Sequence, residues 1–290
     1  MALSNYKQKL DRFPLHVLHL EQSSIGTHHH AFHELVLVVS GEGRHVTATE
    51  EYAISAGDLF LIKPGNPHGY RVESGFSLYN ILYYPELLKL PLFDLADEPG
   101  YRAFFELEPE LRRQFGFRKH FRLGKSQLDE VELLVQRMDR EIESDEPGHN
   151  YRAATLFMRL TERIAATFSN STLYRENDEL FRLSELVSYL ERHRTEPHTV
   201  AALAEKAAMS PATLNRAFRR AVGKSPLHYL NDLRVSGAEQ LLLEKPELPV
   251  AAVAAECGFD DSNYFSRLFK KRTGFTPRAF RQRDGGRSLI

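Results

Sequence analysis

The chain has 290 residues, of which 42% are hydrophobic and 27% charged, with a formal net charge of −1. This balance excludes a mainly disordered chain, and the length predicts two domains of about 100–150 residues each. No apolar run approaches the ~18 residues of a spanning helix, and the first residues lack the apolar segment of a secretory signal. The single cysteine, Cys257, excludes an internal disulfide. We therefore expect a cytoplasmic protein that makes no membrane contact.

Residues 15–85 alternate short apolar runs with turn residues. Val, Ile, Tyr and Phe dominate the runs, whereas Gly, Pro, Asn and Asp separate them. Several short strands at this spacing predict an all-β barrel or sandwich. The runs are LVLVVSGEG, YAISAGD, LFLIKPGNPHGY and SLYNILYY.

After Leu123 the apolar residues recur at helical spacing, first over Ser126–Ser144 and then over Tyr151–Phe168. The first stripe is wider than one partner helix needs, and we expect it to form a dimer interface. Changing Leu134 and Met138 to glutamate would then yield monomers. The alternative, that the stripe covers the barrel and that the same changes unfold the chain, stays open.

The polar, aperiodic stretch NSTLYREND, residues 170–178, is the best candidate for a linker. The fold class we expect is α+β, with an N-terminal barrel, dimerisation helices and an all-α C-terminal domain. The expected divisions are 1–125 for the barrel, 126–175 for the dimerisation helices and linker, and 176–290 for DNA binding.

The C-terminal part contains an internal repeat. AEKAAMSPATLNRAFRRAVGKSP, from Ala204, matches AECGFDDSNYFSRLFKKRTGFTP, from Ala255, at a constant offset of 51 without a gap. Each copy has a short Ala-rich helix, a turn with a capping residue, and a second helix that a glycine ends. The expected caps are Ser210, Asp261, Gly223 and Gly274.

The second helix of each copy is apolar on one face and rich in Arg, Lys and Asn on the other. The DNA major groove accommodates such a helix, because Arg can pair with guanine, Asn with adenine, and further basic residues with phosphates. One such helix alone could be an ordinary surface helix with solvated charges. Two copies in register instead predict a pair of helix-turn-helix units, which the helix PLHYLNDLRVSGAEQLLLEK would hold at a fixed separation.

The segment AECGFDDSNYFSRLFKKRTGFTPRAFRQR resembles the signature of the AraC-type regulators. This resemblance covers the whole C-terminal domain and implies base contacts from outward positions of both recognition helices. Ala212 could offer only van der Waals contact, for example to a thymine methyl group. The expected DNA-binding residues are Ala212, Asn215, Arg216, Arg219, Ser262, Asn263, Ser266, Arg267 and Lys270.

The stretch THHHAFHELVLVVSG is rich in metal-ligating side chains, and strand alternation would place its first ligands on one face. Its spacing resembles the first cupin motif. GDLFLIKPGNPH resembles the second, with departures at Lys63 and Val72. The four cupin ligand positions are filled by His28, His30, Glu34 and His68.

Three interpretations of these four residues stay open: a pocket whose polar groups bind a sugar, a divalent Fe, Mn, Ni or Zn site, and a purely structural cluster. We favour the effector pocket, assign no metal and expect no cofactor. His29 and His33 should face the other way, toward the strand surface or a dimer contact.

The first ninety or so residues resemble the rhamnose-responsive activators of the AraC family. The function we expect is a transcription regulator, an activator rather than a repressor, that responds to a sugar. The alternatives are a sensor of a metal or another small molecule, a metal-dependent cupin enzyme fused to a DNA-binding domain, and an architectural DNA-binding protein. Expected partners are promoter DNA, the effector and a second copy of the chain, with RNA polymerase as a further candidate.

Overall fold

The computed structural model describes residues 3–48, 50–72, 75–115, 121–171, 174 and 178–284. They form two compact units, residues 1–184 and 185–290. Residues 172–173 and 175–177 of the expected linker, and with them the expected division at 175, lie outside the described part of the chain. Among the described residues, no helix combines the length and the apolar character needed to cross a bilayer.

The helices and strands up to residue 115 are α1 Leu3–Arg12, β1 Leu15–Glu21, β2 Ile25–His28, β3 His33–Ser40, β4 Glu42–Thr47, β5 Glu51–Ser55, β6 Leu59–Ile62, β7 His68–Val72, β8 Ser77–Tyr83, α2 Pro85–Leu88, η1 Phe93–Asp97, α3 Pro99–Tyr101, the π-helix η2 Arg102–Leu107 and α4 Glu108–Phe115. The later helices are α5 Lys125–Ile142, α6 His149–Ser169, α8 Asp178–Arg192, α9 Val200–Lys206, α10 Pro211–Val222, α11 Pro226–Glu244, α12 Val250–Glu256, α13 Ser262–Thr273 and α14 Pro277–Asp284.

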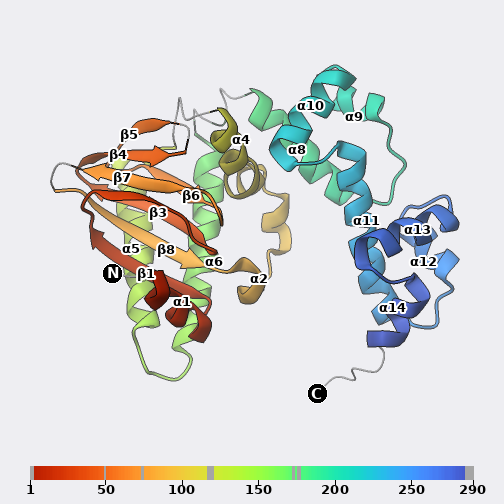
Figure 1. Cartoon of the computed structure of the whole chain (residues 1–290), viewed down its shortest axis with the longest axis horizontal. Helices are drawn as coiled ribbons and strands as arrows, with labels where there is room; N and C mark the ends of the chain where they lie inside the picture. The colour runs from red at the N-terminus through yellow and green to blue at the C-terminus, as the bar shows by residue number, and fades with distance from the viewer. Residues whose placement is uncertain are drawn as a thin grey trace. The chain divides into compact units, whose positions relative to one another are not determined.

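In the described part of the first unit the strands form two antiparallel four-stranded sheets, in the orders β1-β8-β3-β6 and β2-β7-β4-β5 (Figure 1). Alternate residues of β3 and β8 point between the sheets, as the period of two in a strand requires. The expectation of a cupin-like barrel is thereby confirmed. The buried core between the sheets contains Val36, Val38, Tyr52, Ile54, Phe60, Ile62, Tyr70, Phe76 and Leu78.

The barrel is tied to the segment that follows it by an ion pair between the buried Asp58 and the exposed Arg122. Arg122 donates to both carboxylate oxygens of Asp58, at 2.8 and 3.0 Å, and Asp58 also accepts the backbone N–H of Ser55 at 2.7 Å. Between β8 and α5 the chain forms α2, η1, α3, η2 and α4, helices that the strand pattern did not predict. Lys63 on the barrel donates to the backbone oxygen of Glu106 at 2.8 Å, which fixes η2 beside β6.

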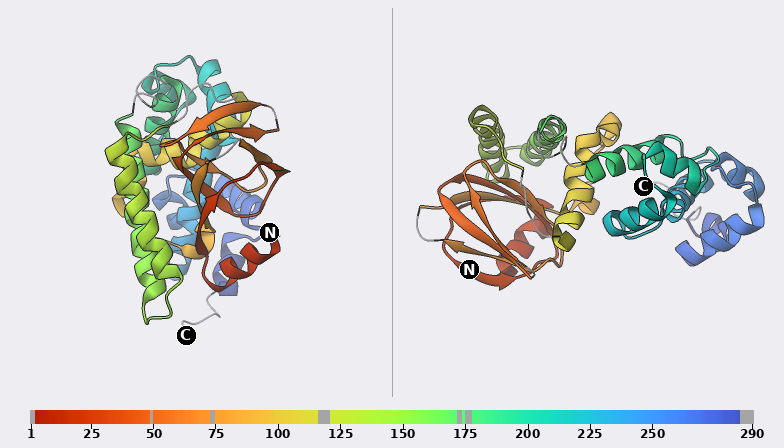
Figure 2. Two further views of the ribbon diagram at one scale, coloured as in Figure 1. Left: turned by 90° about the vertical axis from the view of Figure 1, so that its left-hand side faces the viewer. Right: turned by 90° about the horizontal axis from the view of Figure 1, so that it is seen from above.

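The expected helices over residues 126–144 and 151–168 are present as α5 and α6, and Figure 2 shows them on one side of the barrel. The helix α5 packs against β1, β3 and α6. Leu134 and Met138 are 6% and 0% exposed within a single chain. The apolar stripe therefore covers the barrel, and these two residues are not available as a dimer interface. Leu133 and Tyr151 remain 45% and 79% exposed on the outer side.

His16 on β1 is buried without a hydrogen-bond partner for its Nε2 atom among the described residues. Burial lowers the pKa of its imidazole to about 4, the charge of Lys9 acts in the same direction, and Glu143 opposes them. The unfolded chain, with a His pKa of about 6.5, then binds more protons between these two values. Stability from His16 is complete above pH 6.5 and falls as the pH is lowered toward 4.

We therefore expect the wild type to lose about 2 kcal/mol more stability between pH 7.5 and pH 5 than His16→Leu. Urea unfolding at the two pH values measures this difference. An equal pH dependence in the two proteins would show that His16 is protonated as readily in the folded chain as in the unfolded one.

Candidate functional site

The second unit contains both expected helix-turn-helix units, α9–α10 and α12–α13, with α11 between them (Figure 1). The side chain of Ser210 accepts the backbone N–H of Thr213 at the start of α10, and Asp261 accepts two backbone N–H groups at the start of α13. Gly223 and Gly274 end these helices in the left-handed conformation. All four expected caps are confirmed, because capping depends only on residues within one turn.

The recognition helices α10 and α13 bury their apolar faces and leave the basic faces in solvent. Leu214 and Phe218 are buried in α10, as are Phe265 and Phe269 in α13. The expected DNA-binding residues lie on the opposite faces; Ala212, Arg216, Arg219, Asn263, Arg267 and Lys270 are exposed, and Asn215, Ser262 and Ser266 half-buried.

The turn of the second helix-turn-helix is one residue longer than that of the first. The helix α9 begins at residue 200 and α12 at residue 250, whereas α10 and α13 begin at 211 and 262. The first helices are thus offset by 50 residues and the recognition helices by 51. The prediction of a repeat without gaps is therefore wrong.

Backbone hydrogen bonds identify the corresponding residues. The N–H of Met209 donates to the oxygen of Ala204, and the N–H of Phe259 to that of Ala254, both at 2.9 Å. Ala204 thus corresponds to Ala254 and not to Ala255, and Asp260 occupies the extra position. The chance identity of two Ala-Glu pairs in Ala-rich helices produced the wrong alignment.

Several contacts join the two helix-turn-helix units in addition to the helix α11. Asp232 on α11 pairs with Lys224, which follows α10, and with Arg272 on α13. Arg234 on α11 donates to the backbone oxygens of Arg194 and Glu196, at 2.7 and 2.6 Å. These contacts fix both recognition helices to one helix, which sets their separation on DNA.

The barrel brings His28, His30, Glu34 and His68 together, although not on one strand. His28 ends β2 and pairs with His68 of β7 in the second sheet, whereas Glu34 lies on β3 in the first. His30 lies between strands. The expected continuous strand through these residues is therefore wrong, and the two sheets instead converge on the cluster. His29 is exposed, and the ring of His33 lies 5.2 Å from that of Tyr83.

The three histidines of this cluster share one arrangement. The Nδ1 atoms of His28, His30 and His68 contact the backbone oxygens of Gly26, Phe32 and Asn66, at 3.1, 2.8 and 3.0 Å. A carbonyl oxygen can only accept, so each Nδ1 carries the proton. In the neutral imidazole the lone pair is then on Nε2. The Nε2 atoms of His30 and His68 lie 2.8 and 3.8 Å from Oε2 of Glu34.

Electrostatics keep Glu34 ionised in this buried position. Burial acts to raise the pKa of Glu34, but the contact with His30 and the positive charge that His68, His30 and His28 take up on protonation lower it below its usual value. Burial lowers the pKa of His68, against the opposing effect of Glu34. The carboxylate of Glu34 is therefore ionised at neutral pH and can accept from a hydroxyl donor or bind a cation.

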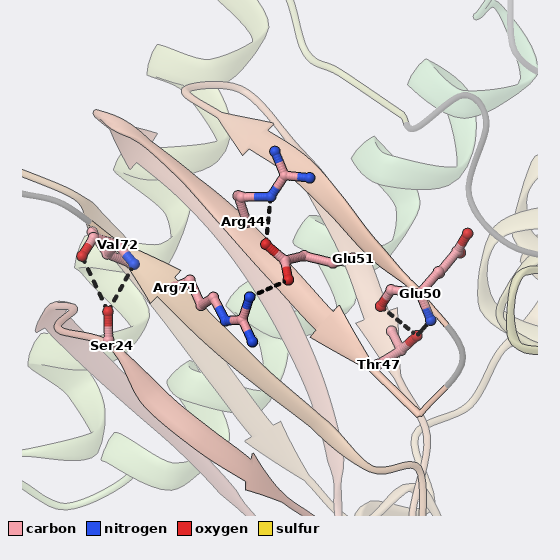
Figure 3. Close-up of polar contacts among 7 residues, drawn as sticks. All are labelled: Ser24, Arg44, Thr47, Glu50, Glu51, Arg71 and Val72. Atoms are coloured by element: carbon pink, nitrogen blue, oxygen red, sulfur yellow. Dashed lines mark hydrogen bonds and ion pairs between the residues drawn. The ribbon is translucent and has the colours of Figure 1, made fainter.

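Two contacts outside the barrel's core hold β2 against β7. Ser24 donates to the oxygen of Val72 at 3.1 Å and accepts the N–H of Val72 at 2.9 Å (Figure 3). Gly69 lies so close to β2 that an added Cβ would be 2.7 Å from the oxygen of Ile25. The absence of a side chain at this position therefore lets His28 and His68 approach each other.

The hairpin of β4 and β5 is held on its outer face by Glu51. Its carboxylate pairs with Arg44 at 2.5 Å and with Arg71 of β7 at 2.7 Å (Figure 3). Opposite-charge pairs on adjacent strands stabilise the pairing of a sheet. The inner face of the same hairpin forms part of a cavity.

A cavity of about 290 Å³ opens beside the cluster. His68 is the member of the cluster that lines it. His45 and Tyr52 lie in the wall, with His45 Nδ1 2.6 Å from the Tyr52 hydroxyl, and sequence reasoning missed both. They are paired opposite each other on β4 and β5. Predicting a β-hairpin with its turn at the polar residues 47–51 would have placed the two side chains side by side. The lining residues are His45, Thr47, Ala48, Tyr52, Leu61, Ile62, Gly65, Asn66, Pro67, His68 and Pro109.

A cavity in a barrel and two helix-turn-helix units in one chain define a class, the DNA-binding regulators that carry a ligand-binding domain. Comparison with known families agrees. Residues 15–161 match the model of the AraC-like ligand binding domain, and residues 203–283 match that of a helix-turn-helix domain.

The chain is similar to known transcription factors over nearly its whole length. It is 31% identical over 265 residues to the HTH-type transcriptional activator RhaS of Escherichia fergusonii, covering 91% of this chain and 90% of that protein. It is also 31% identical over 274 residues to RhaR of Enterobacter sp., covering 94% and 90%. The solved DNA-binding domain of the global transcriptional factor AdpA, in complex with a target DNA, is 36% identical over 37% of this chain and 96% of its own, with a TM-score of 0.35. The chain belongs to the AraC family of transcription regulators.

Proposed function

We propose that this protein is a sugar-responsive transcriptional activator, with a rhamnose-like deoxysugar as the preferred effector. The observation that carries the proposal is a cavity with a few polar side chains in its wall, in a barrel whose chain is related over nine-tenths of its length to the activator RhaS. Its volume of about 290 Å³ is near the lower end of ligand sites, roughly 300–1,000 Å³, and suits a monosaccharide. His45, Tyr52 and Asn66 would bind the hydroxyl groups, with His68 in the wall beside them. His28, His30 and Glu34, which we also expected to contact the effector, do not line the cavity and would instead hold His68 in position.

The test is a thermal-shift and calorimetric screen of the full chain against monosaccharides, with L-rhamnose included. A sugar at 100 times its Kd should add about 2.7 kcal/mol of stability. Tyr52→Phe should weaken binding by about 1 kcal/mol through loss of one neutral hydrogen bond, whereas Tyr151→Phe, at an exposed position on α6, should not. A screen in which every sugar fails while a ligand of another class binds would overturn the proposal.

The regulator is proposed to act in the cytoplasm as a homodimer at promoter DNA, in contact with RNA polymerase, and without a catalytic role. Because Leu134 and Met138 are buried in the single chain, the dimer would use exposed residues of α5 and α6 such as Leu133 and Tyr151. Sedimentation of Leu133→Glu, with and without effector, tests this interface.

We further propose that Arg216 and Arg267 each read a base. They occupy the same position in α10 and α13, and both are exposed. Alanine at either position should cost about 1–3 kcal/mol of specific affinity and relax the preference at one base pair. Arg137→Ala on α5 is the matched control and should leave DNA affinity unchanged.

Titration of specific and random DNA at several salt concentrations distinguishes a contact to a base from a contact to a phosphate. Loss of a base contact weakens specific binding selectively. An equal loss on random DNA, with a smaller salt dependence, would show that the arginine contacts phosphate instead.

A further inference from the structure

The barrel cluster presents several unsatisfied electron-pair donors at one point. One ligand atom from each of His30, Glu34 and His68 lies within 4.8 Å of the other two, and all three side chains are buried. The ring of His28 is 4.4 Å from that of His68, on the more exposed side. Metal–ligand bonds of about 2.0–2.2 Å need only a small closure of this spacing.

A proton alone does not satisfy the cluster. His30 Nε2 and Glu34 Oε2 are 2.8 Å apart, and both are acceptors when the imidazole is neutral, so a proton or a cation must lie between them. A proton there would still leave Glu34 Oε1 and His68 Nε2 buried without a hydrogen-bond partner in the described part of the chain. A divalent cation would bind the lone pairs of all three side chains at once.

The orientation of the imidazoles supports the same conclusion. Each of the three rings is held through Nδ1 by a backbone oxygen, and outer contacts of this kind fix the tautomer and direct Nε2 toward a metal. His45 differs, because its Nδ1 contacts the Tyr52 hydroxyl instead. The backbone contacts thus distinguish the cluster from its histidine neighbour in the barrel.

We propose that His30, Glu34 and His68, with His28 as a fourth ligand, bind a first-row divalent transition-metal ion. Imidazole ligands with one carboxylate favour Zn²⁺, Ni²⁺, Co²⁺, Fe²⁺ or Mn²⁺ over Ca²⁺ and Mg²⁺, which take oxygen ligands. Because His68 also lines the cavity, the ion would fix one wall of the effector site. The inference does not depend on the identity of the effector.

The test uses the untagged full chain, because a histidine tag would itself bind metal. The protein is stripped with a chelator, dialysed against Zn²⁺, Co²⁺, Ni²⁺ or Mn²⁺, and analysed for bound metal, for the visible spectrum of the Co²⁺ form and for Tm. Glu34→Gln and His68→Gln remove ligands with little change of shape. His29→Gln, at an exposed position of the same loop, is the matched control.

The wild type and His29→Gln should hold one equivalent of metal per chain and lose Tm on chelation. Glu34→Gln and His68→Gln should bind the metal more than about 100-fold more weakly than the wild type does. Loss of a residue that only contacts a ligand from outside weakens metal binding by about 10–100-fold. If these variants do not fold, the Co²⁺ spectrum of the wild type decides, because nitrogen–oxygen ligation changes it from that of the aqueous ion. Failure of all four ions to bind stoichiometrically, or equal binding by the ligand variants, would overturn the inference. Binding of a sugar to a protein that takes up no metal would also overturn the inference. That outcome would leave the proposed function standing.

Discussion

Replacing Met138 by glutamate is expected to unfold the N-terminal unit rather than to separate a dimer. Met138 is fully buried in α5, which packs on β1, β3 and α6. Removal of a buried methionine side chain costs about 2–5 kcal/mol, and burial of a carboxyl group without a partner adds roughly 1–3 kcal/mol. The sum is comparable with the whole stability of a typical domain, about 5–15 kcal/mol.

Far-UV circular dichroism and urea unfolding of the full chain measure this loss. Arg137→Glu is the matched control, since it puts the same carboxylate at the exposed position next to Met138 on α5, and its effect on stability should stay within about 0.5 kcal/mol. A Met138→Glu protein that remains folded and sediments as a monomer, where the wild type is a dimer, would restore the interface that the sequence predicted.

Replacing Gly258 by alanine is expected to destabilise the C-terminal unit by about 2–4 kcal/mol, from the left-handed conformation and from overpacking. Its φ is +85°, and an added Cβ would lie 2.6 Å from the oxygen of Thr195 and 2.8 Å from its Cα. These are backbone atoms of the loop before α9, so no side-chain rotation relieves the clash. The turn of the second helix-turn-helix would therefore move away from the first.

Ala208 is the corresponding residue in the first turn and supplies the control. Its φ is +49° and it is exposed. Ala208→Gly should therefore change stability by less than about 1 kcal/mol, since the relief of strain is offset by greater freedom in the unfolded chain.

Hydrogen exchange of the full chain locates the effect of Gly258→Ala. Peptides from residues 250–273 should lose protection, while those from residues 15–83 should not. DNA affinity should fall more for a site with both half-sites than for a single half-site, because Asp232 and Arg234 otherwise hold the two units in one geometry. Unchanged exchange in residues 250–273 would mean that the loop at Thr195 yields without cost.

The sequence by itself determined those features that depend on neighbours along the chain. The caps Ser210, Asp261, Gly223 and Gly274 were predictable because each contacts groups within a few residues. The alternation of apolar and turn residues predicted the strands of the barrel, and helical periodicity predicted α5 and α6. The equivalent positions of Arg216 in α10 and Arg267 in α13 also follow from the local repeat in the sequence.

Only the tertiary structure decided what lies across these elements. An apolar stripe does not specify its partner, so the sequence alone could not distinguish a dimer interface at Met138 from a cover for the barrel. Residue matching could not find the extra Asp260, because the register of the first helices is set by backbone hydrogen bonds and buried packing rather than by identity. The cluster of His28, His30, Glu34 and His68 forms because the two sheets pack face to face. The cavity wall at His45 and Tyr52 likewise depends on pairing between strands, which local sequence does not encode.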